Sequence, residues 1–189
     1  GKTSFGVVAL VRKLTGCPRV GHAGTLDPDA TGVLLLCLGK ATRMAGTLSD
    51  LPKTYKAEVQ LGIATDTYDA SGQVTHRGDA TVVGLEQVER ALNSFRGVIR
   101  QRPPMYSALK VHGRRLYEIA RSGDEIEVAN REVQVFHLEL MTWVPPVLNL
   151  EIKCSKGTYI RSIAHDLGSE LECGAHLRRL IRTSCGSFS

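Results

Sequence analysis

Apolar side chains recur at helical spacing in three stretches of the chain, residues 4–14, 85–95 and 160–171. Each stretch should form a helix with one face on a hydrophobic core. The residues expected to face that core are Val7, Val8, Val11 and Leu14 in the first helix, Leu85, Val88, Leu92 and Phe95 in the second, and Ile160, Ile163, Ala164, Leu167 and Leu171 in the third. The expected caps and stops are Thr3 or Ser4 and Gly16 for the first helix, Gly97 for the second and Thr158 for the third.

Other stretches have the patterns of β-strands. Tyr55–Leu61 alternates apolar and polar side chains, which predicts a strand with one face on the core. Residues 132–142 and 148–154 alternate in the same way, so they should pair as antiparallel neighbours in a mixed sheet. The continuous apolar run 33–38 predicts a buried strand, and a helix should follow over about residues 41–48.

These elements predict a single α+β domain in which helices flank a mixed, mostly antiparallel sheet. The 189 residues are 42% hydrophobic and 23% charged, which is ordinary for a globular domain with a sizeable core. Residues 64–80 are rich in Asp, Thr, Ser and Gly and should form a loop. The longest apolar run is too short for a membrane span, and the first residues lack a signal-peptide pattern, so a cytoplasmic protein is expected. The five cysteines are odd in number and lack metal-site spacing, which predicts neither disulfides nor zinc.

The loop over residues 21–32 carries the first candidate for chemistry. Three glycines, a proline and a histidine surround two carboxylates, directly before the apolar run. Pro28 fixes its own φ and favours an extended conformation at Asp27, so this carboxylate should be held in one pose. A rigid loop at the edge of a buried element is a favourable place for a functional acid. The ordinary alternative is that Asp27 or Asp29 only closes a turn or caps a helix.

A basic stretch follows in the second half of the chain. The net charge of +5 and the pI near 9.1 favour a polyanionic partner without identifying one. Residues 100–115 contain five cations and no acid, interleaved with groups that can stack on bases. Such a surface can grip an RNA loop, although a solvated loop is the ordinary alternative. The cations are Arg100, Arg102, Lys110, Arg114 and Arg115, and the interleaved side chains are Met105, Tyr106 and His112.

The segment Gly21-His22-Ala23-Gly24-Thr25-Leu26-Asp27-Pro28 closely resembles the signature of the TruB family of pseudouridine synthases. Four further motifs resemble the same family in the same order, and together they span most of the chain. They are Lys53-Thr54-Tyr55, Thr65-Asp66-Thr67-Tyr68-Asp69, Pro103-Pro104-Met105-Tyr106-Ser107-Ala108-Leu109-Lys110 and Cys154-Ser155-Lys156-Gly157-Thr158-Tyr159-Ile160-Arg161.

The resemblance implies a role for each matching residue. Asp27 is the catalytic acid, Tyr55 packs on the target base and takes or relays a proton, and Arg161 keeps Asp27 ionised and oriented. His22 fills the gap left by a flipped base, Asp69 helps to hold the arginine, Leu180 lines the uracil pocket, and Lys110 and Arg114 bind RNA on a flexible thumb. Each residue also has an ordinary alternative. Tyr55 could be an aromatic residue at a strand end, Asp69 a turn-closing acid and Leu180 a core leucine. His22 could be a simple loop residue, and Arg161, Lys110 and Arg114 could be surface cations.

The resemblance also implies the activity, which is isomerisation of a uridine in the T-loop of tRNA, at tRNA position 55. No atom leaves in this reaction, so neither a cofactor nor a metal is expected, and the partner is the T-arm of tRNA bound by a monomer. The fold implied is the pseudouridine synthase fold with a thumb inserted at about residues 100–128. The chain is expected to be truncated at its N-terminus and to lack a C-terminal domain of the PUA type.

Two alternatives remain open at this point. One is a catalytically silent tRNA-binding or tRNA-folding module with the same fold, which would keep the basic thumb and His22 but has no need of an acid paired with an arginine. The other is a related synthase that acts on small nuclear or ribosomal RNA with guide partners. Intact Asp27, Tyr55 and Arg161 favour an enzyme.

Overall fold

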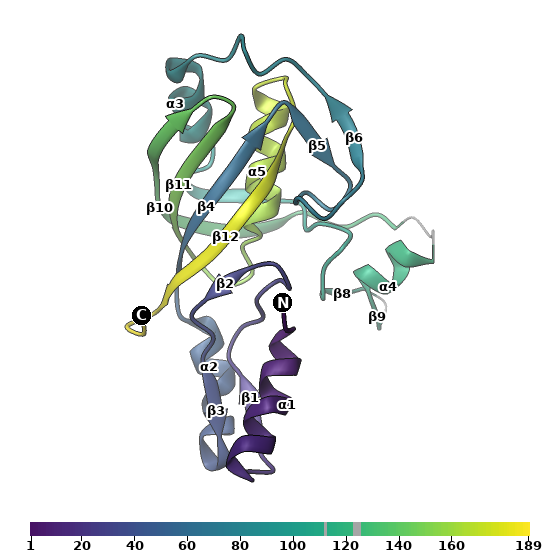
Figure 1. Ribbon diagram of the computed structural model, residues 1–189, viewed down its shortest axis with the longest axis vertical. Coiled ribbons are helices and arrows are strands. Elements are labelled where there is room, and N and C mark those ends of the chain that lie inside the picture. Colours follow the sequence, from purple (N-terminus) through teal and green to yellow (C-terminus); the bar gives the residue numbers. More distant parts are fainter. Residues whose placement is uncertain (112, 123–125) are drawn as a thin grey trace.

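A six-stranded sheet forms the centre of the computed structural model, which describes residues 1–111, 113–122 and 126–189 (Figure 1). Only the pair β2–β12 is parallel, and the other neighbours are antiparallel, so the predicted mixed, mostly antiparallel sheet is confirmed. The strands in spatial order are β2 (Thr31–Gly32), β12 (Ala175–Cys185), β4 (Lys53–Leu61), β11 (Val147–Cys154), β10 (Arg131–Val144) and β7 (Gly97–Gln101).

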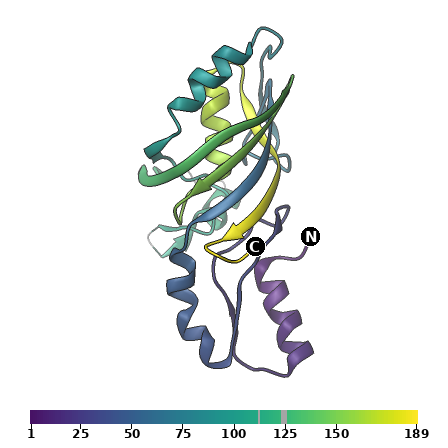
Figure 2. The same ribbon diagram turned by 90° about the vertical axis from the view of Figure 1, so that its left-hand side faces the viewer.

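Two helices, α3 (Leu85–Asn93) and α5 (Ile160–Glu170), cover one face of this sheet (Figures 1 and 2). From Tyr55 to Leu61 of β4 every second side chain is buried in the main core, as the alternating sequence predicted. Gly168 allows the closest approach, since a Cβ at this position would lie 2.1 Å from the Ala175 nitrogen of β12. No helix among the residues that the structure describes is long and apolar enough to cross a membrane.

A smaller lobe lies at one end of the sheet (Figure 1). Its first helix has the predicted cap and stop, because the Thr3 side chain accepts a hydrogen bond from the Gly6 amide and Gly16 adopts a φ of 64°. The lobe consists of α1 (Ser4–Thr15), β1 (Val20–His22), β3 (Leu36–Leu38), the 3₁₀-helix η1 (Gly39–Met44) and α2 (Ala45–Asp50).

Several expected core positions are wrong. Leu14 is 74% exposed and Leu85 is 52% exposed, because each lies at a helix end that no other element covers. Within the apolar run 33–38 only Cys37 is buried, and the strand β3 has three residues. The small lobe offers too few elements to enclose both faces of such a run. The helix expected over residues 41–48 is divided between η1 and α2.

Two local predictions are also corrected. The expected loop 64–80 contains an antiparallel hairpin, β5 (Ile63–Thr65) with β6 (Val74–Arg77), whose main-chain pairing a polar composition does not reveal. Thr158 does not cap α5, because its hydroxyl donates to the Ser155 carbonyl and Tyr159 occupies the N-cap position.

The segment between β7 and β10 projects from the sheet and has a small hydrophobic cluster of its own (Figure 1). The buried members of the cluster are Leu116, Ile119 and Val128. The segment contains β8 (Lys110–Val111), β9 (Arg114–Arg115) and α4 (Leu116–Arg121). His112, one of the predicted stacking residues, lies outside the described residues, as does the part of the predicted thumb at residues 123–125.

The contact between α5 and β12 generates a stability prediction. Gly168→Ala should lower the free energy of unfolding by about 1–3 kcal/mol, because the added methyl group overlaps the β12 backbone. The control is Gly46→Ala in α2, where nothing lies within 4 Å of the new Cβ and alanine favours the helix. Urea unfolding measures both variants. Equal stability of the two would contradict the close packing at Gly168.

Candidate active site

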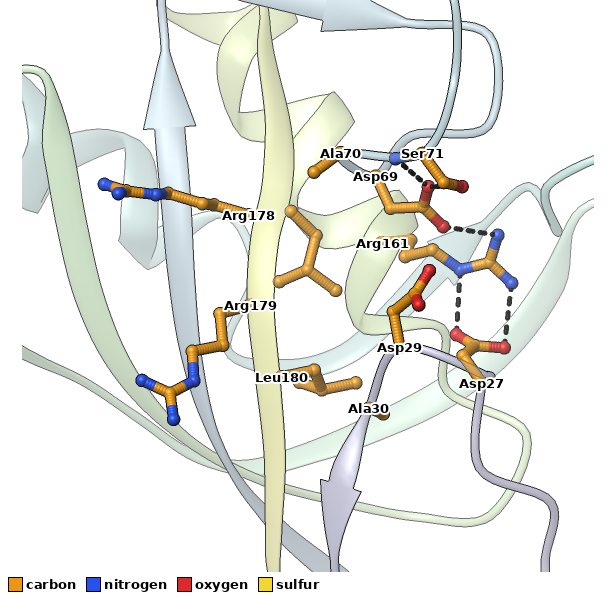
Figure 3. Close-up of a pocket in the computed structure, with 11 residues that line it drawn as sticks. Asp27, Asp29, Ala30, Asp69, Ala70, Ser71, Arg161, Arg178, Arg179 and Leu180 are labelled. Carbon is orange, nitrogen blue, oxygen red and sulfur yellow. Dashed lines mark hydrogen bonds and ion pairs between the residues drawn. The ribbon is translucent and has the colours of Figure 1, made fainter. Parts of the chain in front are cut away.

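A cavity of about 250 Å³ lies where the small lobe meets the sheet (Figure 3). One water molecule occupies about 30 Å³ in the liquid, so the cavity has room for several. The loop before β2, the loop after β5, the start of α5 and the middle of β12 all contribute to its wall. The lining residues are Asp27, Asp29, Ala30, Asp69, Ala70, Ser71, Arg161, Leu177, Arg178, Arg179 and Leu180.

The predicted pairing of Asp27 with Arg161 is present in this wall (Figure 3). The Arg161 Nη2 donates to Asp27 Oδ1 at 3.1 Å, and Nε lies 2.9 Å from Oδ2. The Nε contact is an ion pair without hydrogen-bond alignment. Because the planar guanidinium contacts both oxygens, it fixes the plane of the carboxylate as well as its position.

The two partners differ in their access to solvent. The Arg161 side chain is 6% exposed and the Asp27 side chain is 40% exposed. Arg161 Nη1 also donates to the Thr67 carbonyl at 3.1 Å and to Asp69 Oδ2 at 3.3 Å, and Nη2 donates to the Tyr106 carbonyl at 3.2 Å. The arginine is therefore enclosed by protein groups, whereas the carboxylate of Asp27 remains open to the cavity.

Asp69 is held on the other side of the same guanidinium (Figure 3). Its Oδ1 accepts hydrogen bonds from Thr67 Oγ1 at 2.7 Å, from the Ser71 amide at 3.0 Å and from Ser71 Oγ at 2.6 Å. Hydrogen bonds of this kind to nearby residues are typical of an aspartate in a turn. They involve only Oδ1, so Oδ2 is available to pair with Arg161. One residue thus has both the turn-closing and the arginine-holding role that the sequence left open.

The loop that carries Asp27 is tied to the first helix. Ser4, which is 5% exposed, accepts from the Leu26 amide at 3.0 Å and donates to the Leu26 carbonyl at 3.3 Å. The Ala30 amide donates to the Asp27 carbonyl at 3.0 Å and closes a turn around Pro28. The pose of Asp27 is thereby restrained on both sides of the carboxylate.

Tyr55 is not among the residues that line the cavity. It is 9% exposed and packs in the main core, directly opposite Arg182 in the β4–β12 pair. Burial raises the pKa of Tyr55 to about 12, although the charge of Arg182 acts in the opposite direction. Its phenol is therefore neutral near pH 7, so it can donate or accept a hydrogen bond but does not act as a phenolate base.

His22 lies outside the cavity wall, beside the first helix. Its ring contacts Phe5 edge-to-face, with 5.3 Å between the ring centroids. Burial, and then the charge of Arg182, lower the pKa of His22, so the imidazole is neutral near pH 7. Its Nδ1 is buried and has no hydrogen-bond partner.

The other predicted residues are divided between the cavity and the projecting segment. Leu180 is 8% exposed and lines the cavity (Figure 3). Lys110 and Arg114 are exposed, lie on β8 and β9, and do not line it. Arg114 Nη2 contacts Ser122 Oγ at 3.3 Å.

Three arginines near the site are not among the residues that the sequence predicted for it. Arg178 and Arg179 are exposed and line the cavity from β12, and Arg179 also lies 3.6 Å from Glu58 (Figure 3). The sequence shows that this stretch is basic, but it does not show that these side chains lie beside the cavity. Arg182 is 1% exposed and contacts the Asp27 loop from within the protein. An arginine in a strand pattern gives no signal for that position.

The carboxylates and the arginine of this cavity do not form a metal site. Among the described residues no group of three histidine, cysteine, aspartate or glutamate side chains is placed to hold a metal ion. Asp27 and Asp69 instead share a guanidinium, which supplies the local positive charge.

Solved structures share this fold across the whole chain. The structure described as a Cbf5-Nop10-Gar1 complex matches with a TM-score of 0.76 and 32% identity, covering 100% of this chain and 47% of the other. An H/ACA RNP bound to a substrate RNA containing 2'-deoxyuridine matches with a TM-score of 0.73 and 29% identity, covering 100% and 45%. The chain therefore has the pseudouridine synthase fold.

Sequence comparison gives the family. The model of the TruB family pseudouridylate synthase, N-terminal domain, matches residues 12–160. The tRNA pseudouridine synthase B of Dehalococcoides mccartyi is 49% identical over 189 residues, which are 100% of this chain and 63% of the relative. That of Symbiobacterium thermophilum is 48% identical over 191 residues, covering 100% and 64%. The chain belongs to the TruB family, as its motifs predicted, and it spans less than two thirds of the length of these relatives.

A half-buried carboxylate in α5 generates a pH prediction. Asp166 lies in α5, and burial raises the pKa of its carboxyl to about 6. The unfolded chain loses this proton at lower pH than the folded chain, so the stability that the neutral carboxyl contributes is present below about pH 4 and is lost as the pH rises to about 6. Asp166→Asn should therefore raise the melting temperature more at about pH 8 than at about pH 4.5. The exposed control Glu127→Gln should show no such difference, and an equal effect of Asp166→Asn at both pH values would contradict the prediction.

Proposed function

We propose that this chain carries the catalytic site of a tRNA pseudouridine synthase that converts a uridine of the T-loop, at tRNA position 55, to pseudouridine. The observation that supports the proposal best is the open carboxylate of Asp27, held by the buried fork of Arg161 at the wall of the cavity. The relatives named tRNA pseudouridine synthase B support tRNA as the substrate.

The reaction breaks the bond between N1 of uracil and C1′ of ribose, turns the base, and joins C5 to C1′. C5 loses a proton and N1 gains one, so the atoms of substrate and product are the same. The enzyme must therefore stabilise a detached base and move protons. Asp27 can do this as a nucleophile at C1′, as a nucleophile at C6 of the uracil, or by assisting deprotonation at C2′.

Arg161 keeps Asp27 in the form that this chemistry needs. A carboxylate that is covered by a bound base loses hydration, which favours its protonated form unless a cation is close. The guanidinium stays charged at any working pH and already contacts both oxygens. Because Arg161 is itself held by Thr67, Asp69 and Tyr106, it need not reorganise when the substrate binds.

The target base must leave its stack in the RNA loop to reach this cavity, at a cost of a few kcal/mol. Leu177 and Leu180 offer an apolar surface for the uracil ring. Tyr55 is neutral, so its hydroxyl can relay the C5 proton if it reaches the bound base. His22 is neutral and can stack in the gap that the base leaves. The exposed cations of β8, β9 and β12 can contact RNA phosphates.

The second candidate is a tRNA-binding or tRNA-folding module of the same fold without chemistry. The exposed cations fit both functions. The complete arrangement of Asp27, Arg161 and Asp69 favours the enzyme, because a binding module gains nothing from burying an arginine to orient a solvent-facing carboxylate.

Incubation with an unmodified T-arm stem-loop tests the function. The wild-type chain should produce pseudouridine at the T-loop position, detected by chemical mapping. Asp27→Asn should lose product formation by several orders of magnitude and keep its RNA affinity, because the change removes the charge and preserves size and polarity. Tight binding by the wild type without product would favour the module, and turnover by Asp27→Asn would remove Asp27 from the mechanism.

The projecting segment generates a second prediction. Lys110→Ala should weaken RNA binding and reduce the slope of log Kd against log salt by about 1 or less, because each phosphate contact releases counterions. Arg90→Ala is the control, since Arg90 is an exposed cation on α3, away from the cavity. The measurement is Kd for the stem-loop at several salt concentrations. Equal slopes and affinities in both variants would place Lys110 away from the RNA.

A further inference from the structure

Two buried cations lie beneath the loop that carries Asp27. A Cβ at Gly24 would lie 3.7 Å from Arg182 Nη1 and 3.7 Å from Lys53 Cε. Arg182 is 1% exposed and Lys53 is 5% exposed. Among the described residues no carboxylate lies within ion-pair distance of Arg182, and its guanidinium donates to the main-chain carbonyls of Gly24, Thr25 and Val33. Burying a charge without a carboxylate partner costs free energy unless the charged group is well hydrogen-bonded. The position of Arg182 therefore needs a structural or functional reason.

Arg182 contacts both ends of the Asp27 loop. At the start of the loop, Nη2 donates to the Gly24 carbonyl at 3.2 Å and Nη1 lies 3.4 Å from the Thr25 carbonyl oxygen. At its end, Nε donates to the Val33 carbonyl at 2.7 Å. One side chain therefore joins the two ends of the segment 24–33, which contains Asp27 and its turn.

The backbone of Arg182 adds to the same attachment. Its carbonyl accepts from the Val33 amide at 2.8 Å, and β12 pairs with β2 at Gly32. Gly32 has a φ of 104°, and a Cβ there would lie 2.1 Å from the Arg182 oxygen, so only glycine permits this approach. The end of the loop is thus attached to β12 at Ile181 and Arg182.

Arg182 also faces Tyr55. The two residues are direct partners in the antiparallel β4–β12 register, so their side chains lie on the same face of the sheet. The charge of Arg182 lies close enough to influence the pKa of Tyr55, His22 and Lys53. A single guanidinium therefore influences three ionisable side chains, of which Tyr55 is its direct partner in the strand register.

We propose that Arg182 is a positioning residue that sets the placement of Asp27 relative to Tyr55, by joining both ends of the Asp27 loop to the strand that faces Tyr55. The catalytic part of this proposal rests on the proposed function. Arg161 orients the carboxylate from the cavity side, and Arg182 fixes the backbone that presents it. Lys53 serves a different purpose, because its ammonium donates to the carbonyls of Ser49 and Leu51, at the end of α2.

The test compares Arg182→Met and Arg182→Lys with the matched control Lys53→Met. Methionine keeps the length and removes every donor, whereas lysine keeps the charge but cannot reach Gly24 and Val33 together. The single-turnover rate on the T-arm stem-loop should fall about ten- to a hundredfold in Arg182→Met and less in Arg182→Lys, because small misplacements of catalytic groups cost about that much. Stem-loop Kd should stay within about threefold in each variant, and Lys53→Met should stay near the wild-type rate.

Amide hydrogen exchange provides a readout that does not depend on turnover. The Ala30 amide closes the Asp27 turn, so it should lose protection in both Arg182 variants and keep it in Lys53→Met, while amides of α5 and β4 stay protected in all three. Normal rates with normal Ala30 protection in both Arg182 variants would overturn the proposal. Loss of protection throughout the chain, in Arg182→Lys as well as in Arg182→Met, would also overturn it in favour of a role in global stability. Absence of product from the wild type would refute the proposed function instead, and the exchange data would still decide whether Arg182 holds the loop.

Discussion

The ion pair between Asp27 and Arg161 is the interaction on which the rest of the site depends. A guanidinium that is 6% exposed must find its partners within the protein. Both Nη groups of Arg161 donate to Asp27, Thr67, Asp69 and Tyr106, and Nε forms an ion pair with Asp27. These partners come from three separate segments of the chain. Each segment must be folded in place before the arginine can be buried, so formation of the site is coupled to formation of the tertiary fold.

This coupling explains why the cavity lies at the junction of the lobe and the sheet. The lobe supplies the open carboxylate, the sheet and α5 supply rigid supports, and the segment before β8 supplies a main-chain carbonyl to the arginine. Gln101 extends the same support, because its buried amide accepts from the Tyr159 amide and donates to the Tyr159 carbonyl, two residues before Arg161. The start of α5 is thereby fixed against β7.

Features that depend on neighbouring residues in the sequence could be predicted, whereas features that depend on contacts between distant residues could not. Periodicity identified β4, β10, β11, α3 and α5, because each has a regular face on one shared core. It was wrong at Leu14 and Leu85, where exposure depends on whether a distant element covers a helix end. The motif resemblance gave Asp27, Asp69 and Arg161, which the structure brings together. Arg161 lies off the apolar face of its helix and is buried only because residues far away in sequence cover it, and Arg182 gave no local signal at all.

The distribution of charge around the cavity favours entry of a neutral group. Asp27, Asp29 and Asp69 face a single lining guanidinium, that of Arg161, so this part of the wall is negative (Figure 3). Arg178 and Arg179 lie on the opposite side of Leu180, on β12, and their side chains point away from the acids (Figure 3). A phosphate would be repelled from the acidic wall and attracted to the exposed cations, whereas an uncharged base meets no such barrier. Under the proposed function, this distribution would keep the phosphates of the RNA at the rim of the cavity and let one flipped, uncharged base enter it.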